Sequence, residues 1–139
     1  IVHDLKPEQM DKKQLDIALE EFFHEVQVNS GIDIQFRKNE PTFTLSSEAE
    51  LSIFRGVQEA ITNAMRHGQA TRITVLLMYN PSQLVVTIKD NGTGAVDLAP
   101  KGGLKFLQER LRSEGGSVTF EASNSGVTVQ MILPNTEKQ

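Results

Sequence analysis

The 139-residue sequence contains no cysteine, which excludes disulfide bonds and thiolate metal sites. It has no run of 18 apolar residues and no basic-then-apolar leader, so neither a membrane-spanning helix nor a signal peptide is expected. Lys and Arg number 14 against 18 Asp and Glu, and the formal net charge of −4 argues against a nucleic-acid partner. Internal repeats, low-complexity segments and linkers are absent too. We therefore expect the domain itself to be soluble, and the location expected for it is the cytoplasm, whether its parent is membrane-anchored or soluble.

What is present fits one folded domain. Apolar residues make up 38% of the sequence and are spread along its whole length. A chain of this size buries a sufficient core without metal or disulfide support. Pro7 would stop any helix that arrives from upstream, because the residue before a proline is pushed out of helical geometry. We expect residues 11–134 to form the domain, residues 1–10 to be a junction, and residues 135–139 to be a polar tail.

Two amphipathic helices and an edge strand are predicted in the first half of the chain. Residues 11–14 (DKKQ) form a capping-box pattern, and the helix after it ends at Gly31. A second capping box at residues 47–50 (SEAE) opens another helix. Between them, residues 32–36 alternate like an edge strand, and residues 42–45 are a candidate short partner strand. The apolar positions expected to face the core are Leu15, Leu19, Phe22 and Val26 in the first helix and Leu51, Phe54, Val57, Ile61 and Met65 in the second.

Four strands and one further helix are predicted in the second half. A glycine-rich loop at 90–102 precedes a helix whose leucines at 104, 107 and 111 point inward, and a glycine pair at 115–116 ends that helix. Helices interleaved with antiparallel strand pairs predict an α+β two-layer sandwich, with a mixed, mostly antiparallel sheet and helices on one face. The predicted strands are residues 72–79, 84–89, 118–122 and 127–133.

A polar cluster lies along the second helix. Glu59 and Asn63 are four residues apart and therefore share one face of the helix, and Arg66 and His67 follow them. Alone, the cluster is more typical of an ordinary solvated helix face.

A second cluster, DNGTG at residues 90–94, directly follows an apolar strand. A carboxylate at the end of a buried strand is costly unless it has a partner, which singles out Asp90. Gly92 and Gly94 allow a sharp turn and the close approach of a flat ligand. The pentapeptide alone is compatible with a simple turn and with a ligand loop.

The third cluster is the glycine pair Gly102 and Gly103, followed by Leu104 at the start of a helix. Backbone donors and the axial dipole at a helix N-terminus favour an anion, although such a pair also occurs in plain loops. No Walker lysine motif is present, and no dinucleotide-binding G-x-G-x-x-G follows the first strand.

In combination, these clusters resemble the nucleotide fold that histidine kinases share with type II topoisomerase and heat-shock chaperone ATPases (the Bergerat-type ATP-binding fold). Residues 59–67 (EAITNAMRH) resemble the N box, and residues 90–94 resemble the G1 box. Residues 103–116 resemble the G2 region of the short-lidded histidine kinases that pair with LuxR-type regulators. Residues 4–7 (DLKP) are similar to the junction that follows the dimerisation helices of these kinases.

The resemblance implies a role for each candidate residue. The ligand would be ATP with magnesium, held by the Asn63 oxygen, and Glu59 would be the catalytic polarising base or hold a metal-bound water. Asp90 would accept a hydrogen bond from the adenine amino group. The remaining candidates are Arg66 and His67 at the phosphates, Gly92 and Gly94 beside the purine, Gly103 beside the lid, and Gly102 and Leu104 as further cofactor-binding residues.

The implied activity is that of a sensor histidine kinase. It would transfer the γ-phosphoryl group to a histidine on a dimerisation domain outside this sequence, for relay to a response regulator. The fragment would be a monomer and its parent a homodimer, and His3 would not be the acceptor, because Pro7 follows it closely.

Other functions remain open at this stage. One is a serine kinase of the anti-sigma-factor type, and another is a degenerate domain that only binds proteins. The second is suggested by Lys101, Phe106 and Val127, which depart from the pattern of the subfamily. A chaperone-like or topoisomerase-like ATPase is a further alternative, disfavoured by the short chain.

Overall fold

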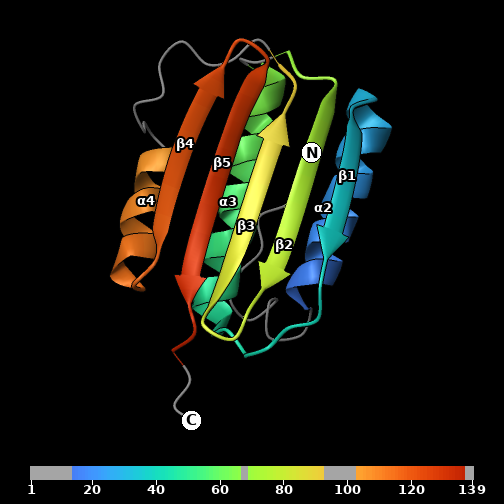
Figure 1. The fold of residues 1–139 in the computed structure, drawn as a ribbon. Helices are drawn as coiled ribbons and strands as arrows, with labels where there is room; N and C mark the ends of the chain where they lie inside the picture. Colours follow the sequence, from blue (N-terminus) through green and yellow to red (C-terminus); the bar gives the residue numbers. More distant parts are fainter. Residues whose placement is uncertain (1–13, 67–68, 93–102, 137–139) are drawn as a thin grey trace.

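The computed structural model describes residues 14–66, 69–92 and 103–136. Within them the chain forms two layers, a five-stranded sheet and three helices that all pack on one face of it (Figure 1). The order of helices and strands confirms the predicted one. The elements are α2 (Leu15–Ser30), β1 (Asp33–Lys38), α3 (Ser47–Arg66), β2 (Arg72–Tyr79), β3 (Gln83–Asp90), α4 (Gly103–Ser113), β4 (Ser117–Ser123) and β5 (Gly126–Pro134).

The strand order of the sheet is β1-β2-β3-β5-β4. Only β1 and β2 are parallel, and the other three pairs are antiparallel. Side chains alternate along β2 and β3, because every second residue points toward the helices and is buried. This architecture confirms the predicted α+β sandwich with a mixed, mostly antiparallel sheet.

The hydrophobic core lies between the helices and the sheet. All four apolar positions predicted for the first helix are buried, as are Leu51, Phe54, Val57 and Ile61 of α3. They meet a layer of aliphatic residues from the three central strands, among them Val75, Val86 and Met131. The helix ends are also as predicted, since Gly31 and Gly115 adopt left-handed backbone angles with φ of 78° and 83°.

Two predicted helix starts are wrong. Gln14 has extended backbone angles, so it cannot be the third helical residue of a capping box, and α2 begins at Leu15. In α3 the cap is Ser46 rather than Ser47, because the Ser46 Oγ accepts a hydrogen bond from the Ala49 amide at 3.1 Å. Because Ser46 and Ser47 are adjacent, either could be the N-cap residue, and the sequence pattern does not distinguish them.

Two further predictions fail for reasons of tertiary packing. Residues 42–45 form no strand, since Thr42 Oγ1 donates to the Asn80 carbonyl and Phe43 packs edge-on against Tyr79, with ring centroids 5.3 Å apart. Met65, expected in the core, is 38% exposed because it lies in the last turn of α3. In the part of the chain that the structure describes, no helix combines the length and apolar character needed to cross a membrane.

Candidate nucleotide-binding site

The three polar clusters meet at one end of the sheet. The C-terminal ends of α3 and β3, the first residue of β5 and the N-terminal end of α4 all point toward this end (Figure 1). Ile73 of β2 pairs with Asp90, and Asn91 bonds to Thr71, just before β2, and to Arg72, its first residue, so the segment that leads into β2 lies beside the end of β3. Clusters that are distant in sequence therefore share one region of the fold.

Glu59 and Asn63 lie on the face of α3 that turns toward α4. Gly56 marks this face, because a Cβ atom added there would lie only 2.8 Å from Leu107 Cδ2 of α4. Glu59 and Asn63 follow Gly56 at intervals of three and four residues, which places all three on one stripe of the helix. Both polar side chains are half-buried. The structure thus places a carboxylate and an amide beside the region from which α4 begins.

Asp90 is the buried carboxylate of the site, with a relative exposure of 8%. Its Oδ1 accepts backbone hydrogen bonds from Gly92 at 2.9 Å and from Val127 at 3.2 Å. These donors fix the carboxylate in one orientation and offset part of the cost of burying it. Both of these hydrogen bonds reach Oδ1, and no donor among the described residues donates to Oδ2.

Gly126 makes this arrangement possible. It has φ of 140°, and a Cβ atom added to it would lie 1.9 Å from the Asp90 carbonyl oxygen and 3.1 Å from Asp90 Oδ1. Only glycine allows the backbone of β5 to approach Asp90 so closely. The sequence did not predict Gly126 as a neighbour of Asp90, because the pairing of β3 with β5 is a tertiary contact.

Val127 departs from the subfamily pattern only in its side chain. The group that reaches Asp90 is its backbone N–H, which every residue except proline provides. The substitution therefore leaves the hydrogen bond to the carboxylate in place.

The structure places some of the remaining candidate residues. Arg66 is the exposed last residue of α3, and Gly92 is buried beside Asp90. Gly103 and Leu104 begin α4, so the amide donors of a helix N-terminus lie near the site. His67, Gly94 and Gly102 lie outside the described residues.

The oxygen atoms of Asn63 and Glu59 suit magnesium better than they suit a metal ion whose ligands all come from the protein. No group of three or more His, Cys, Asp or Glu residues that could hold a metal occurs within the described parts of the chain. Magnesium commonly takes only one or two protein ligands and completes its shell with phosphate oxygens and water. Asn63 and Glu59, on one face and half-buried, satisfy that smaller requirement.

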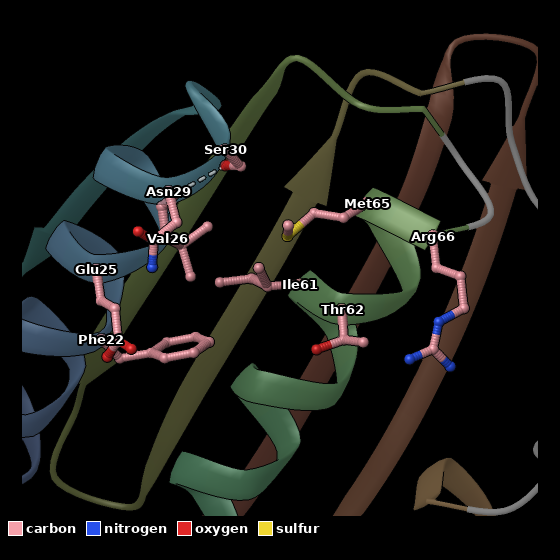
Figure 2. A pocket seen from close by; sticks show the side chains of 9 residues that line it. All are labelled: Phe22, Glu25, Val26, Asn29, Ser30, Ile61, Thr62, Met65 and Arg66. Atoms are coloured by element: carbon pink, nitrogen blue, oxygen red, sulfur yellow. Dashed lines mark hydrogen bonds between the residues drawn. The ribbon is translucent and has the colours of Figure 1, made fainter. Parts of the chain in front are cut away.

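A groove with a volume of about 430 Å³ lies on the other side of α3, between α3 and α2 (Figure 2). Its apolar walls are Phe22 and Val26 of α2 and Ile61 and Met65 of α3. Figure 2 shows the Ile61 side chain extending toward α2, while the Arg66 guanidinium points away from the groove. This groove is therefore separate from the face that carries Glu59 and Asn63.

Comparisons with known proteins agree with this geometry. The family model of histidine kinase-, DNA gyrase B-, and HSP90-like ATPases matches residues 48–137. The chain is 30% identical over 140 residues to the sensor histidine kinase MctS of Rhizobium johnstonii, covering 96% of this chain and 30% of MctS. It is also 30% identical over 139 residues to the oxygen sensor histidine kinase NreB of Staphylococcus carnosus, covering 96% of this chain and 40% of NreB.

The fold is similar to that of a solved histidine kinase domain. The domain belongs to the blue-light activated histidine kinase EL346 of Erythrobacter litoralis, with a TM-score of 0.69 and 21% identity over 88% of this chain and 65% of that one.

The names of the relatives support a histidine kinase over the serine kinase and the interaction module considered above. Since the family model covers most of the chain, the chain belongs to the histidine kinase-, DNA gyrase B- and HSP90-like ATPase family, and it is similar over 96% of its length to a part of two sensor histidine kinases.

Proposed function

We propose that this domain binds ATP with magnesium and donates the γ-phosphoryl group to a histidine on a separate dimerisation domain. The phosphoryl group then passes to an aspartate of a response regulator. Residues 11–134 are the catalytic unit, and residues 1–10 connect it to the dimerisation helices of a homodimeric parent. The observation that carries this proposal is the buried, oriented carboxylate of Asp90 at the end where the polar faces of the fold meet.

Asp90 recognises the base. Two backbone donors occupy Oδ1, and Oδ2 accepts a hydrogen bond from the adenine amino group. A guanine presents a carbonyl oxygen at the corresponding position and would leave the buried carboxylate without a donor, which is unfavourable. Gly92 and Gly94 leave room for the purine ring.

The phosphates lie along the C-terminal half of α3. Asn63 offers its side-chain oxygen to magnesium, which neutralises charge on the triphosphate when it is bound. Arg66 and His67 supply charge-assisted hydrogen bonds to the phosphates. The amide groups of Gly103 and Leu104 at the start of α4 add donors for the anion, and Gly102 is a further residue assigned to nucleotide binding.

Catalysis depends mainly on positioning and on charge neutralisation. In phosphoryl transfer the attacking and leaving atoms lie roughly in line, and the protein holds them there. Glu59, half-buried on the same face as Asn63, polarises the incoming histidine by accepting a hydrogen bond from its ring N–H. The arrangement of α3 and α4 on one face of a rigid sheet keeps these groups in register.

The division of labour between two domains can be tested with ATP labelled at its γ-phosphate. The 139-residue chain is expected to bind ATP without acquiring acid-labile phosphate, whereas the longer protein that contains the dimerisation domain acquires it on histidine. Mass spectrometry at neutral pH would locate the group. Phosphohistidine on the isolated chain would refute the separate-acceptor model, and phosphoserine on a partner would favour the serine kinase.

A further inference from the structure

We propose that Asn91 is a positioning residue that joins the base-binding and phosphate-binding halves of the site, an inference that rests on the proposed function. Asn91 follows Asp90 at the point where β3 ends, and its side chain is exposed. Its backbone N–H donates to the Arg72 carbonyl at 3.2 Å, which continues the β2–β3 ladder by one further bond.

Beyond the end of β3, the Asn91 side chain provides hydrogen bonds to the backbone of the neighbouring segment. Its Oδ1 accepts hydrogen bonds from the backbone amides of Thr71 and Arg72, both at 2.9 Å. Its Nδ2 donates to Thr71 Oγ1 at 3.0 Å. One amide side chain thus satisfies two consecutive backbone donors and a hydroxyl, a bidentate arrangement that fixes position as well as distance.

The segment held by Asn91 is the exit of α3. The Ala70 amide donates to the Ala64 carbonyl at 3.1 Å, so the chain just before Thr71 is bonded back to the last turn of the helix. That turn carries Arg66 and directly follows Asn63. Two hydrogen-bonded contacts, joined by the peptide bond between Ala70 and Thr71, therefore connect Asn91, the residue beside Asp90, to the last turn of α3.

Asp90 does not depend on Asn91 for its own position. Its carboxylate is held by the amides of Gly92 and Val127, the second of which lies on β5. Removal of the Asn91 side chain should therefore displace the phosphate ligands relative to the base and leave base recognition intact. If Asn91 only stabilised the fold, its removal would lower the affinity for ATP and for adenosine equally, or would change neither.

The fold supplies a matched control at the opposite end of β2 and β3. Asn80 Oδ1 accepts hydrogen bonds from the Ser82 amide at 2.8 Å, the Gln83 amide at 2.9 Å and Ser82 Oγ at 2.8 Å. Asn80→Ala removes a similar number of side-chain hydrogen bonds as Asn91→Ala, far from the candidate site. Both side chains are exposed, so both variants should remain folded.

The test compares binding of Mg-ATP and of adenosine to the wild type and the two variants, by calorimetric or competitive titration. Asn91→Ala is expected to weaken ATP binding about tenfold and adenosine binding less than about twofold, while Asn80→Ala changes neither. Amide exchange should accelerate at Thr71 and Arg72 in the first variant and at Ser82 and Gln83 in the second.

The outcomes separate this inference from the function on which it rests. Wild-type protein that binds no ATP overturns the proposed function and the inference together. If wild type binds ATP and Asn91→Ala binds it equally well, despite faster exchange at Thr71 and Arg72, the proposed function stands and the positioning role is refuted. An equal loss of ATP and adenosine affinity also refutes it.

Discussion

The contact between Asp90 and Gly126 sets the geometry of the candidate site at the scale of single residues. Asp90 closes β3, and the first residue of β5 lies against its carbonyl oxygen with no room for a side chain. The same approach brings the Val127 amide to Asp90 Oδ1. Base recognition in this account therefore depends on Gly126, because its close approach positions the donor that orients Asp90.

Gly126→Ala is expected to destabilise the fold far more than Gly31→Ala. Gly31 has φ of 78° with nothing within 4 Å of an added Cβ, so its substitution costs only the strain of a left-handed residue, about 1–2 kcal/mol. At Gly126 the same kind of strain adds to a clash with backbone, and we expect a loss of about 3 kcal/mol or more.

Urea unfolding of both variants would measure this difference. Equal losses of unfolding free energy in the two variants would show that the close approach to Asp90 is not a constraint on the fold.

The sequence identified Asp90 but not the groups that orient it. A carboxylate after an apolar strand is visible in the sequence, because burial of an unpaired charge is costly. Its partners Gly126 and Val127 are brought to it by the pairing of β3 with β5, and one sequence does not specify that register. Asn91 was missed for a related reason, since its role depends on Thr71 and Arg72 across the strand pair.

At the scale of elements, alternation and helical periodicity predicted most of the fold. The run from Arg72 to Tyr79 is a strand with the predicted bounds, because β-branched and aliphatic residues alternate between the two faces of the sheet. The errors fall where local pattern is ambiguous, as at Ser46 and Ser47, or where a tertiary contact decides the outcome, as for Phe43 against Tyr79.

Where α4 packs against α3, the partly buried carboxyl group of Glu114 predicts that the stability of the domain depends on pH. Glu114, in the turn after α4, has one buried carboxyl oxygen without a hydrogen-bond partner among the described residues. Burial raises the pKa of the Glu114 carboxyl above its ordinary value, and the nearby Glu48 carboxylate adds to this shift. The Arg110 guanidinium and a hydrogen bond with Ser52 act in the opposite direction.

Glu114→Gln is therefore expected to stabilise the domain at pH 8 and to have little effect near pH 4 (about the ordinary pKa of a glutamate). Because its pKa is raised in the folded state, the folded protein binds more protons than the unfolded chain at pH values between the ordinary pKa of the carboxyl and the raised one. The stability that this group contributes is present at low pH and is lost as the pH rises through the raised pKa. The glutamine stays neutral and avoids that loss.

The measurement is urea unfolding between pH 4 and pH 8. Glu121→Gln, which removes one charge from an exposed position on β4, is the control and should show no such trend. A stabilisation by Glu114→Gln that is the same at pH 4 and pH 8 would contradict the assignment.

At the scale of the whole molecule, α3 separates two surfaces of different character. One face carries Glu59 and Asn63 toward α4, and the other forms the apolar wall of the groove against α2. The sheet covers one side of all three helices (Figure 1). In this account the acceptor histidine lies on another domain and approaches the end of the sheet at which Asp90 lies.

The most direct test of this account is calorimetric titration of Mg-ATP into the wild type and Asp90→Asn, with Asp33→Asn as a control for loss of a carboxylate at an exposed position. In Asp90→Asn the side-chain oxygen keeps its bonds to Gly92 and Val127, but an NH₂ group replaces Oδ2 and faces the adenine amino group, donor against donor. We expect wild type and Asp33→Asn to bind ATP with micromolar to sub-millimolar affinity, and Asp90→Asn to lose at least about tenfold. Equal binding by Asp90→Asn and wild type, or no binding by any of the three, would contradict the assignment of the site.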